Sequence, residues 1–140
     1  MNVFDLLKVL TAIPGVSGHE DSIARTVSDY LRPYVDDVRI DTLANVIARI
    51  GTGEGARVAI CAHLDTVGFL VKRRETMPPD ATLRVVTVGG INLKAASGAL
   101  VELHTADGKV PGMIGVRSQH QAALVQDGTP SMEDLYIHVA

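Results

Sequence analysis

The repeating pattern of apolar residues changes close to Gly68, and this change limits how the chain can fold. Before it, apolar residues recur at helical spacing in two stretches, and three strand-like segments follow, at residues 38–41, 45–50 and 58–62. After it, the pattern predicts short strands separated by glycine and proline turns, at residues 67–71, 82–88, 100–104 and 110–116. A mixed α/β segment followed by a run of short strands predicts two domains, the second a small β-barrel or sandwich.

The two predicted helices have recognisable ends. The first covers residues 4–11 and is stopped by Pro14 and Gly15. The second is expected to begin at Ser17, because Ser17 and Glu20 have the spacing of a capping box. No Gly-x-Ser-x-Gly elbow is present in the sequence, so Ser17 is interpreted as a helix cap rather than a nucleophile.

Residues 58–62 are apolar on both faces, as expected for a strand in the middle of an α/β sheet. His63 follows at the carboxyl end of this strand, which is where open α/β sheets bind ligands. A carboxylate near a metal-binding imidazole fixes its tautomer and orientation, and Asp65 is spaced for that role. The pattern therefore favours a metal site at His63, with an ordinary surface histidine as the alternative. Cys61, inside the strand and without a basic neighbour, is predicted to be an inert buried thiol.

Composition excludes several classes of function. Sixteen acidic residues against thirteen basic ones give a net charge of −3, which argues against a nucleic-acid partner or an anionic membrane. The apolar runs are too short to cross a bilayer, so no membrane partner is expected. A single cysteine excludes a disulfide framework and predicts a cytoplasmic protein.

The pattern of the last residues leads us to expect a truncated chain that stops in a strand. Residues 118–133 have the character of a polar loop, and residues 135–140 form an apolar strand. A strand left bare at a sheet edge is a liability, so we expect it to belong to a larger sheet. The predicted domains are therefore residues 1–67 and 134–140 of one α/β domain, with a β-rich insert at residues 68–133.

Several stretches, in their order along the chain, resemble the M42 family of metallo-aminopeptidases. The resemblance begins with Pro-Gly-Val-Ser-Gly-His-Glu at residues 14–20, residues 41–48, and Ala-His-Leu-Asp-Thr-Val-Gly-Phe at residues 62–69. It continues through residues 88–90 and 103–115 and ends at residues 134–137, so it covers nearly the whole chain.

The resemblance implies an α/β fold in which a zinc-exopeptidase-like catalytic domain is interrupted by a small β-barrel insert. It also implies two divalent ions per active site, zinc or cobalt, that activate a water to remove N-terminal residues from peptide substrates. His63 matches the histidine that binds one ion, and Asp65 matches the catalytic aspartate that orients this site. The β-rich insert implies a homo-oligomer.

Two departures from the family pattern affect these expectations. Thr66 stands where the family usually has an acidic residue, so no role of that acid is transferred. The family's other metal ligands lie beyond the last residue of this chain, so we expect the chain to be inactive by itself. The alternatives are a dipeptidase-like zinc-exopeptidase and a non-catalytic oligomerisation or interaction module.

Overall fold

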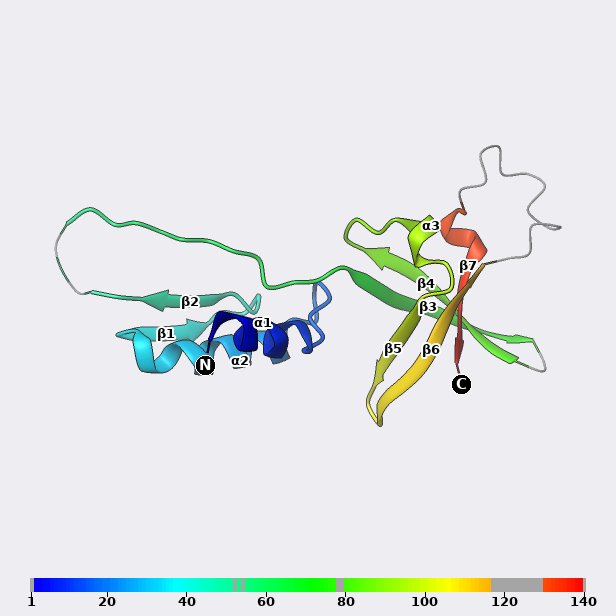
Figure 1. Ribbon diagram of the computed structural model, residues 1–140, viewed down its shortest axis with the longest axis horizontal. Helices are drawn as coiled ribbons and strands as arrows, with labels where there is room; N and C mark the ends of the chain where they lie inside the picture. Colours follow the sequence, from blue (N-terminus) through cyan, green and yellow to red (C-terminus); the bar gives the residue numbers. More distant parts are fainter. Residues whose placement is uncertain (1, 52, 54, 78–79, 117–129, 140) are drawn as a thin grey trace. The chain divides into compact units, whose positions relative to one another are not determined.

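The computed structural model describes residues 2–51, 53, 55–77, 80–116 and 130–139. The chain divides into two compact units, residues 1–66 and 67–140 (Figure 1). Among the described residues, none of the helices has the length and apolar character needed to cross a membrane.

The first unit contains the two predicted helices. Helix α1 (Val3–Thr11) is capped by Asn2, whose side-chain oxygen accepts the backbone N–H of Asp5 at 2.9 Å. Helix α2 (Asp21–Leu31) is followed by the short 3₁₀ helix η1 (Arg32–Tyr34), because Pro33 prevents the α-helix from continuing. Helix α2 buries Ile23, Ala24 and Ser28.

The predicted capping box at the start of α2 is wrong. The N-cap residue is Glu20, and its side chain makes no capping hydrogen bond. Residues 16–19 form a turn instead, in which the backbone N–H of His19 donates to Val16 O at 2.8 Å and Gly18 has a φ of 86°. Only glycine adopts this φ readily, so the chain turns here before the helix begins, and Ser17 lies outside it.

Strands β1 (Asp37–Ile40) and β2 (Val46–Arg49) form an antiparallel hairpin against which α2 packs (Figure 1). Asp41 organises the connecting turn, because its carboxylate accepts the backbone N–H groups of Leu43 and Asn45 and the side-chain amide of Asn45, each at 2.9 Å. These bonds hold the pKa of Asp41 below its usual range, with the Asn45 side chain as the largest cause. Ala44, also in the turn, has a φ of 61°.

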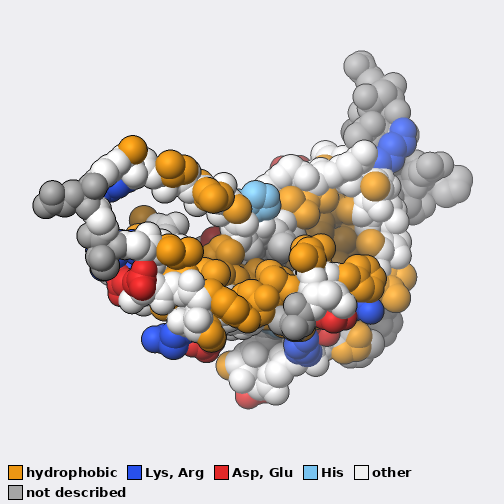
Figure 2. Space-filling view, turned by 60° about the vertical axis from the view of Figure 1, so that its left-hand side comes forward, with side chains coloured by type: hydrophobic (Ala, Val, Ile, Leu, Met, Phe, Trp, Pro, Cys, Tyr) orange, Lys and Arg blue, Asp and Glu red, His pale blue; other side chains and the backbone are white. Residues whose placement is uncertain are grey.

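The strand predicted at residues 58–62 is absent. This stretch has no regular secondary structure, and Val58 and Ile60 are 88% and 96% exposed. Figure 2 shows many hydrophobic side chains open on this face of the molecule. A strand that is apolar on both faces needs a neighbour on each side, and the described part of the first unit supplies only the β1–β2 hairpin. For the same reason Cys61 is an exposed thiol, not the buried one expected.

The described residues of the second unit form a five-stranded antiparallel sheet with the order β3-β4-β7-β6-β5. Its strands are β3 (Gly68–Met77), β4 (Asp80–Val88), β5 (Leu100–Thr105), β6 (Gly108–Val116) and β7 (Leu135–Val139). The four short strands predicted after Gly68 are confirmed, with β3 much longer than expected. Because β3 and β5 stand at opposite ends of the strand order, the expected closed barrel is not confirmed.

Two short helices described in this unit were not predicted from the sequence. Helix α3 (Leu93–Ala96) has only four residues, too few for a periodic pattern, and Asn92 caps it by accepting the N–H groups of Lys94 and Ala95. The 3₁₀ helix η2 (Met132–Asp134) leads into β7 and carries a capping box between Ser131 and Asp134. Most of the predicted polar loop at residues 118–133 lies outside the described residues.

Strand β7 corrects the predicted assignment of residues 134–140. It pairs with β4 on one side and β6 on the other, so it lies inside the sheet of the second unit. Its inward side chains, Leu135 and Ile137, are 0% and 3% exposed and form the core with Val85, Ala96 and Ile114. An apolar strand such as β7 is stabilised where other strands pair with its two edges and other side chains cover its apolar face. The second unit provides the pairing strands and the covering side chains.

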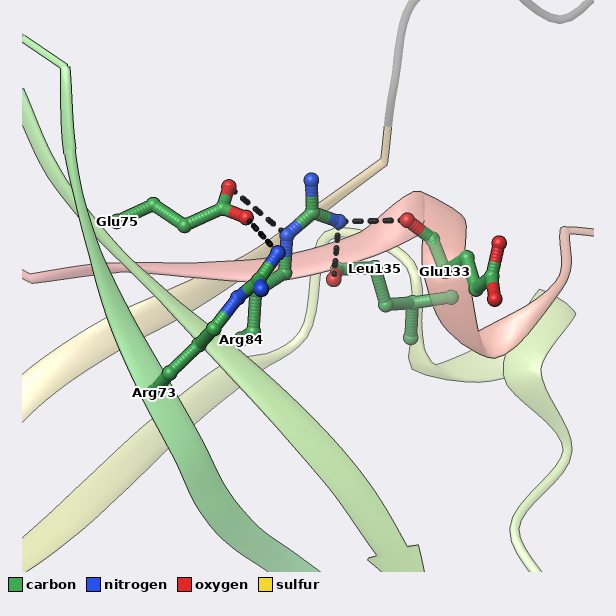
Figure 3. A network of polar contacts seen from close by, with 5 residues as sticks. All are labelled: Arg73, Glu75, Arg84, Glu133 and Leu135. Atoms are coloured by element: carbon green, nitrogen blue, oxygen red, sulfur yellow. Dashed lines mark hydrogen bonds and ion pairs between the residues drawn. The ribbon is translucent and has the colours of Figure 1, made fainter.

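Arg84, in β4, forms hydrogen bonds with the backbone at the start of β7 (Figure 3). Its Nε lies 2.9 Å from a carboxylate oxygen of Glu75, and one terminal nitrogen donates to the backbone oxygens of Glu133 at 2.5 Å and Leu135 at 3.3 Å. Arg73 binds the other oxygen of Glu75 at 2.7 Å. The two arginines, Arg73 first, lower the pKa of Glu75. With its side chain only 13% exposed, Arg84 links three segments of the unit.

Candidate functional site

His63 and Asp65 lie together, as the sequence pattern predicted. The Nδ1 atom of His63 is 2.9 Å from the backbone oxygen of Asp65 and 3.1 Å from its carboxylate Oδ1. Both oxygens accept hydrogen bonds, so the hydrogen of the neutral imidazole is assigned to Nδ1. The Nε2 lone pair is then available to bind a ligand, on a side chain that is 85% exposed.

The Asp65 carboxylate has a second partner that the sequence did not indicate. The hydroxyl of Ser17 donates to Asp65 Oδ2 at 2.5 Å. This bond is the main cause that lowers the pKa of Asp65, burial opposes it, and the charge of His63 adds to the lowering. Asp65 is therefore an ionised carboxylate between a hydroxyl and an imidazole.

Backbone contacts bring Ser17 to Asp65 although 48 positions separate them in the chain. The backbone N–H of Thr66 donates to Gly15 O at 2.7 Å, and Val16 and Thr66 form a parallel bridge. Gly15 is buried, and a Cβ there would approach Ile23 Cγ2 to 3.2 Å. The tight turn after α1 therefore lays the Ser17 loop alongside residues 64–66.

A hollow of about 360 Å³ borders this pair of residues. Its polar lining comes from Glu20, Asn45, His63 and Asp65, and α2 contributes apolar side chains. The β1–β2 turn forms another wall, which includes Ala44 with its positive φ. A backbone conformation that is unfavourable for alanine beside a polar hollow is common at ligand sites, so the turn marks this part of the unit as a candidate site.

Among the side chains described at this site, His63 is suited to bind a metal ion. His63 offers an exposed Nε2 with its ring already oriented, as a metal-binding histidine requires. Within the described residues, however, no group of three or more His, Cys, Asp and Glu side chains could hold an ion. The described chain therefore presents a single oriented ligand, which does not by itself make a tight site.

Two other described histidines have partners within the second unit. His104 lies in the second unit and pairs with Glu102 at 3.2 Å, and His138 packs edge-on against Tyr136. The role of Ser17 was not found from the sequence, because Ser17 and Glu20 also have the spacing of a helix cap. The signal that could have shown it is the pair of glycines around it, Gly15 and Gly18, which are typical of a turn.

Comparison with known proteins identifies the family. The model of the family described as M42 glutamyl aminopeptidase matches residues 44–140. The lysyl aminopeptidase of Pyrococcus furiosus is 35% identical over 118 residues, which cover 84% of this chain and 33% of that protein.

Solved structures of aminopeptidases also match this chain. An aminopeptidase from the archaeon Desulfurococcus kamchatkensis matches with a TM-score of 0.84 and 30% identity, covering 97% of this chain and 36% of that one. The TET1 peptidase of Pyrococcus horikoshii, reported to assemble into a tetrahedron or a large octahedral shell, matches with a TM-score of 0.76 and 29% identity, covering 97% of this chain and 40% of that one. The chain thus spans about a third of the length of its curated relatives. From the family match, which covers more than half of its residues, the chain belongs to the M42 glutamyl aminopeptidase family.

Proposed function

We propose that this chain contributes part of the active site of a metal-dependent aminopeptidase, which removes N-terminal residues from peptides. The observation that carries the proposal is the His63–Asp65 contact, which directs Nδ1 to the aspartate and leaves Nε2 for an ion. Family membership supports the same conclusion, because the matched relative from Pyrococcus furiosus is named a lysyl aminopeptidase.

In the proposed reaction, two divalent ions, zinc or cobalt, would supply the Lewis acid and the activated water. His63 would donate one Nε2 lone pair to an ion. Asp65, ionised and bonded to Nδ1, would keep the ring in the correct tautomer and increase its basicity. The hollow beside them, with Glu20 and Asn45 on its wall, would receive the amino end of the peptide.

The other ligands of a two-ion site would have to come from outside the described residues. We therefore expect the 140-residue chain to hold less than one ion tightly and to show no turnover. Metal content measured by mass spectrometry and hydrolysis of amino-acid p-nitroanilides test this expectation. Efficient cleavage by the 140-residue chain would contradict it.

The ligand role of His63 can be tested without activity. Zinc titrated into the isotope-labelled chain should shift the imidazole signals of His63, and His63→Ala should remove the weak binding. His19→Ala is the matched control, because His19 is an exposed histidine of the same unit. Zinc binding that survives His63→Ala and is lost in His19→Ala would refute the proposed site.

The second unit suggests how the protein assembles. The match to a TET1 peptidase reported to form large shells supports a homo-oligomer built through the β-rich unit. Exposed apolar side chains on its strands, including Val71 and Met113, provide surface for such contacts. Light scattering after size exclusion should detect an oligomer, and Val71→Asp should weaken it. An oligomer without metal binding at His63 would favour the alternative of a non-catalytic module.

We expect the protein to act in the cytoplasm. Its one cysteine, Cys61, is an exposed free thiol, and such thiols persist in reducing compartments.

A further inference from the structure

Ser17, Asp65 and His63 form a chain of polar contacts, and His63 Nδ1 also lies 2.9 Å from the backbone oxygen of Asp65. The Ser17 hydroxyl donates to Oδ2 of Asp65 at 2.5 Å, and Oδ1 of the same carboxylate lies 3.1 Å from Nδ1 of His63. A carboxylate held at only one oxygen can rotate about its χ2 bond, whose energy profile is broad. Held at both oxygens, it has one orientation.

The order of the three groups decides which role Ser17 can have. A serine nucleophile needs its hydroxyl bonded to the base that removes its proton, usually an imidazole nitrogen. Here the hydroxyl donates to the carboxylate, and the carboxylate separates it from the ring. Ser17 is therefore placed to orient Asp65 rather than to attack a substrate.

The backbone of the loop that carries Ser17 is held by contacts other than the Ser17–Asp65 hydrogen bond. The Gly15–Thr66 hydrogen bond and the Val16–Thr66 bridge attach its loop to the residues that follow His63. The turn from Val16 to His19 holds the loop from the other side. A donor on a rigid loop can impose an orientation on its acceptor, whereas a mobile one would only follow it.

From these contacts we propose that Ser17 is a positioning residue for the metal ligand, acting through Asp65. Its hydroxyl turns the carboxylate so that Oδ1 faces His63 Nδ1. Together with Asp65 O, 2.9 Å from the same nitrogen, this second acceptor keeps the hydrogen of the ring on Nδ1 and the lone pair on Nε2. This inference rests on the proposed ligand role of His63, and it assigns Ser17 a function beyond that role.

The test measures the tautomer of His63 in the 140-residue chain by nitrogen NMR, at a pH where the ring is neutral. Removing one hydrogen bond of ordinary strength with Ser17→Ala should lower the ratio of the Nδ1–H to the Nε2–H tautomer by about 3- to 10-fold. Ser17→Thr keeps a hydroxyl and should restore the ratio. Ser22→Ala, a matched change at an exposed position of α2, should leave it unchanged.

Zinc affinity provides a second readout. Ser17 acts on the metal ligand only through Asp65, so losing its hydroxyl should weaken zinc binding less than losing Asp65. Ser17→Ala should therefore weaken zinc binding by about 3- to 10-fold, at or below the lower end of the effect typical of direct partners. In the tautomer measurement, made without zinc, Ser17→Cys keeps the shape of the side chain but is a weak donor, so it should give the same tautomer ratio as Ser17→Ala. Ser17→Ala could also disturb the loop, which would be seen as faster exchange of the Thr66 amide. In that case the tautomer ratio of Ser17→Cys decides whether Ser17 positions the ring.

A tautomer ratio that is equal in wild type and in Ser17→Cys would overturn the role of Ser17. So would a ratio in Ser17→Thr that is as low as in Ser17→Ala. These outcomes differ from failure of the proposed function, in which zinc would not bind His63 in the wild-type chain whatever its tautomer.

Discussion

Replacing Leu135 with alanine should destabilise the second unit and leave the first unchanged. Leu135 is fully buried, and it lies in the strand that joins β4 to β6. Its side chain belongs to the core cluster with Val85, Ile114 and Ile137. The substitution therefore removes buried methyl groups at the centre of the sheet and leaves a cavity that the surrounding strands fill only in part.

The expected cost is about 3 kcal/mol, within the range of roughly 2–5 kcal/mol found for buried leucines cut to alanine. A unit the size of residues 67–140 has a total stability of about 4–11 kcal/mol, so this is a large fraction of it. A loss of about 3 kcal/mol corresponds to roughly 150-fold faster exchange of those amides that open only when the unit unfolds.

Hydrogen exchange followed by mass spectrometry measures both units in one experiment. Peptides from β3, β4 and β6 should lose protection, and peptides from α2 should not. The matched control is Leu100→Ala, because Leu100 is a leucine of the same unit that is 84% exposed, and its loss should cost less than about 0.5 kcal/mol. Equal loss of protection in α2, or an equal cost for Leu100→Ala, would refute the placement of β7 in the second unit.

Other predictions concern the polar contacts. Asp65→Asn should keep some zinc binding but weaken it about 10- to 100-fold, measured by calorimetry, and unchanged affinity would contradict its role as partner of the ligand. Because the pKa of Asp65 is lowered on folding, its contribution to stability is present above about pH 4, the ordinary range of an aspartate, and is lost as the pH falls through the lowered pKa. Acid unfolding of Ser17→Ala should therefore depend less on pH in that window than that of the wild type. Ala44→Gly should stabilise the first unit by about 0.5 kcal/mol in denaturant titrations, because glycine adopts the φ of 61° without strain, and a loss of stability would contradict the argument. Arg84→Met should speed amide exchange in β7, whereas Arg73→Ala, with a side chain that is 66% exposed, should have little effect.

Local patterns predicted most of the secondary structure. The apolar spacing of α1 and α2 and the turn residues between β5 and β6 are properties of short stretches, so the sequence alone reveals them. His63 and Asp65 were found for the same reason, because only two positions separate them.

Features that depend on distant partners could not be predicted in this way. Residues 58–62 have the composition of a buried strand, but whether they form one depends on neighbours that the described first unit lacks. The composition of β7 predicts a strand correctly but cannot say which sheet receives it. The Ser17–Asp65 bond joins segments 48 residues apart, and no local spacing indicates such a contact.

The central place of β7 also has a consequence for the order of folding. The pairs β3–β4 and β5–β6 connect strands that are neighbours in the chain, so each can form as soon as its own residues are synthesised. Strand β7 pairs with β4 through Thr82 and His138, across more than fifty residues, and it is the last of the five described strands to leave the ribosome. Until it arrives, two separate hairpins expose apolar side chains such as Ile114 that are covered only in the finished sheet. The interval before β7 inserts is therefore when a nascent chain of this protein is most prone to aggregate and to need a chaperone.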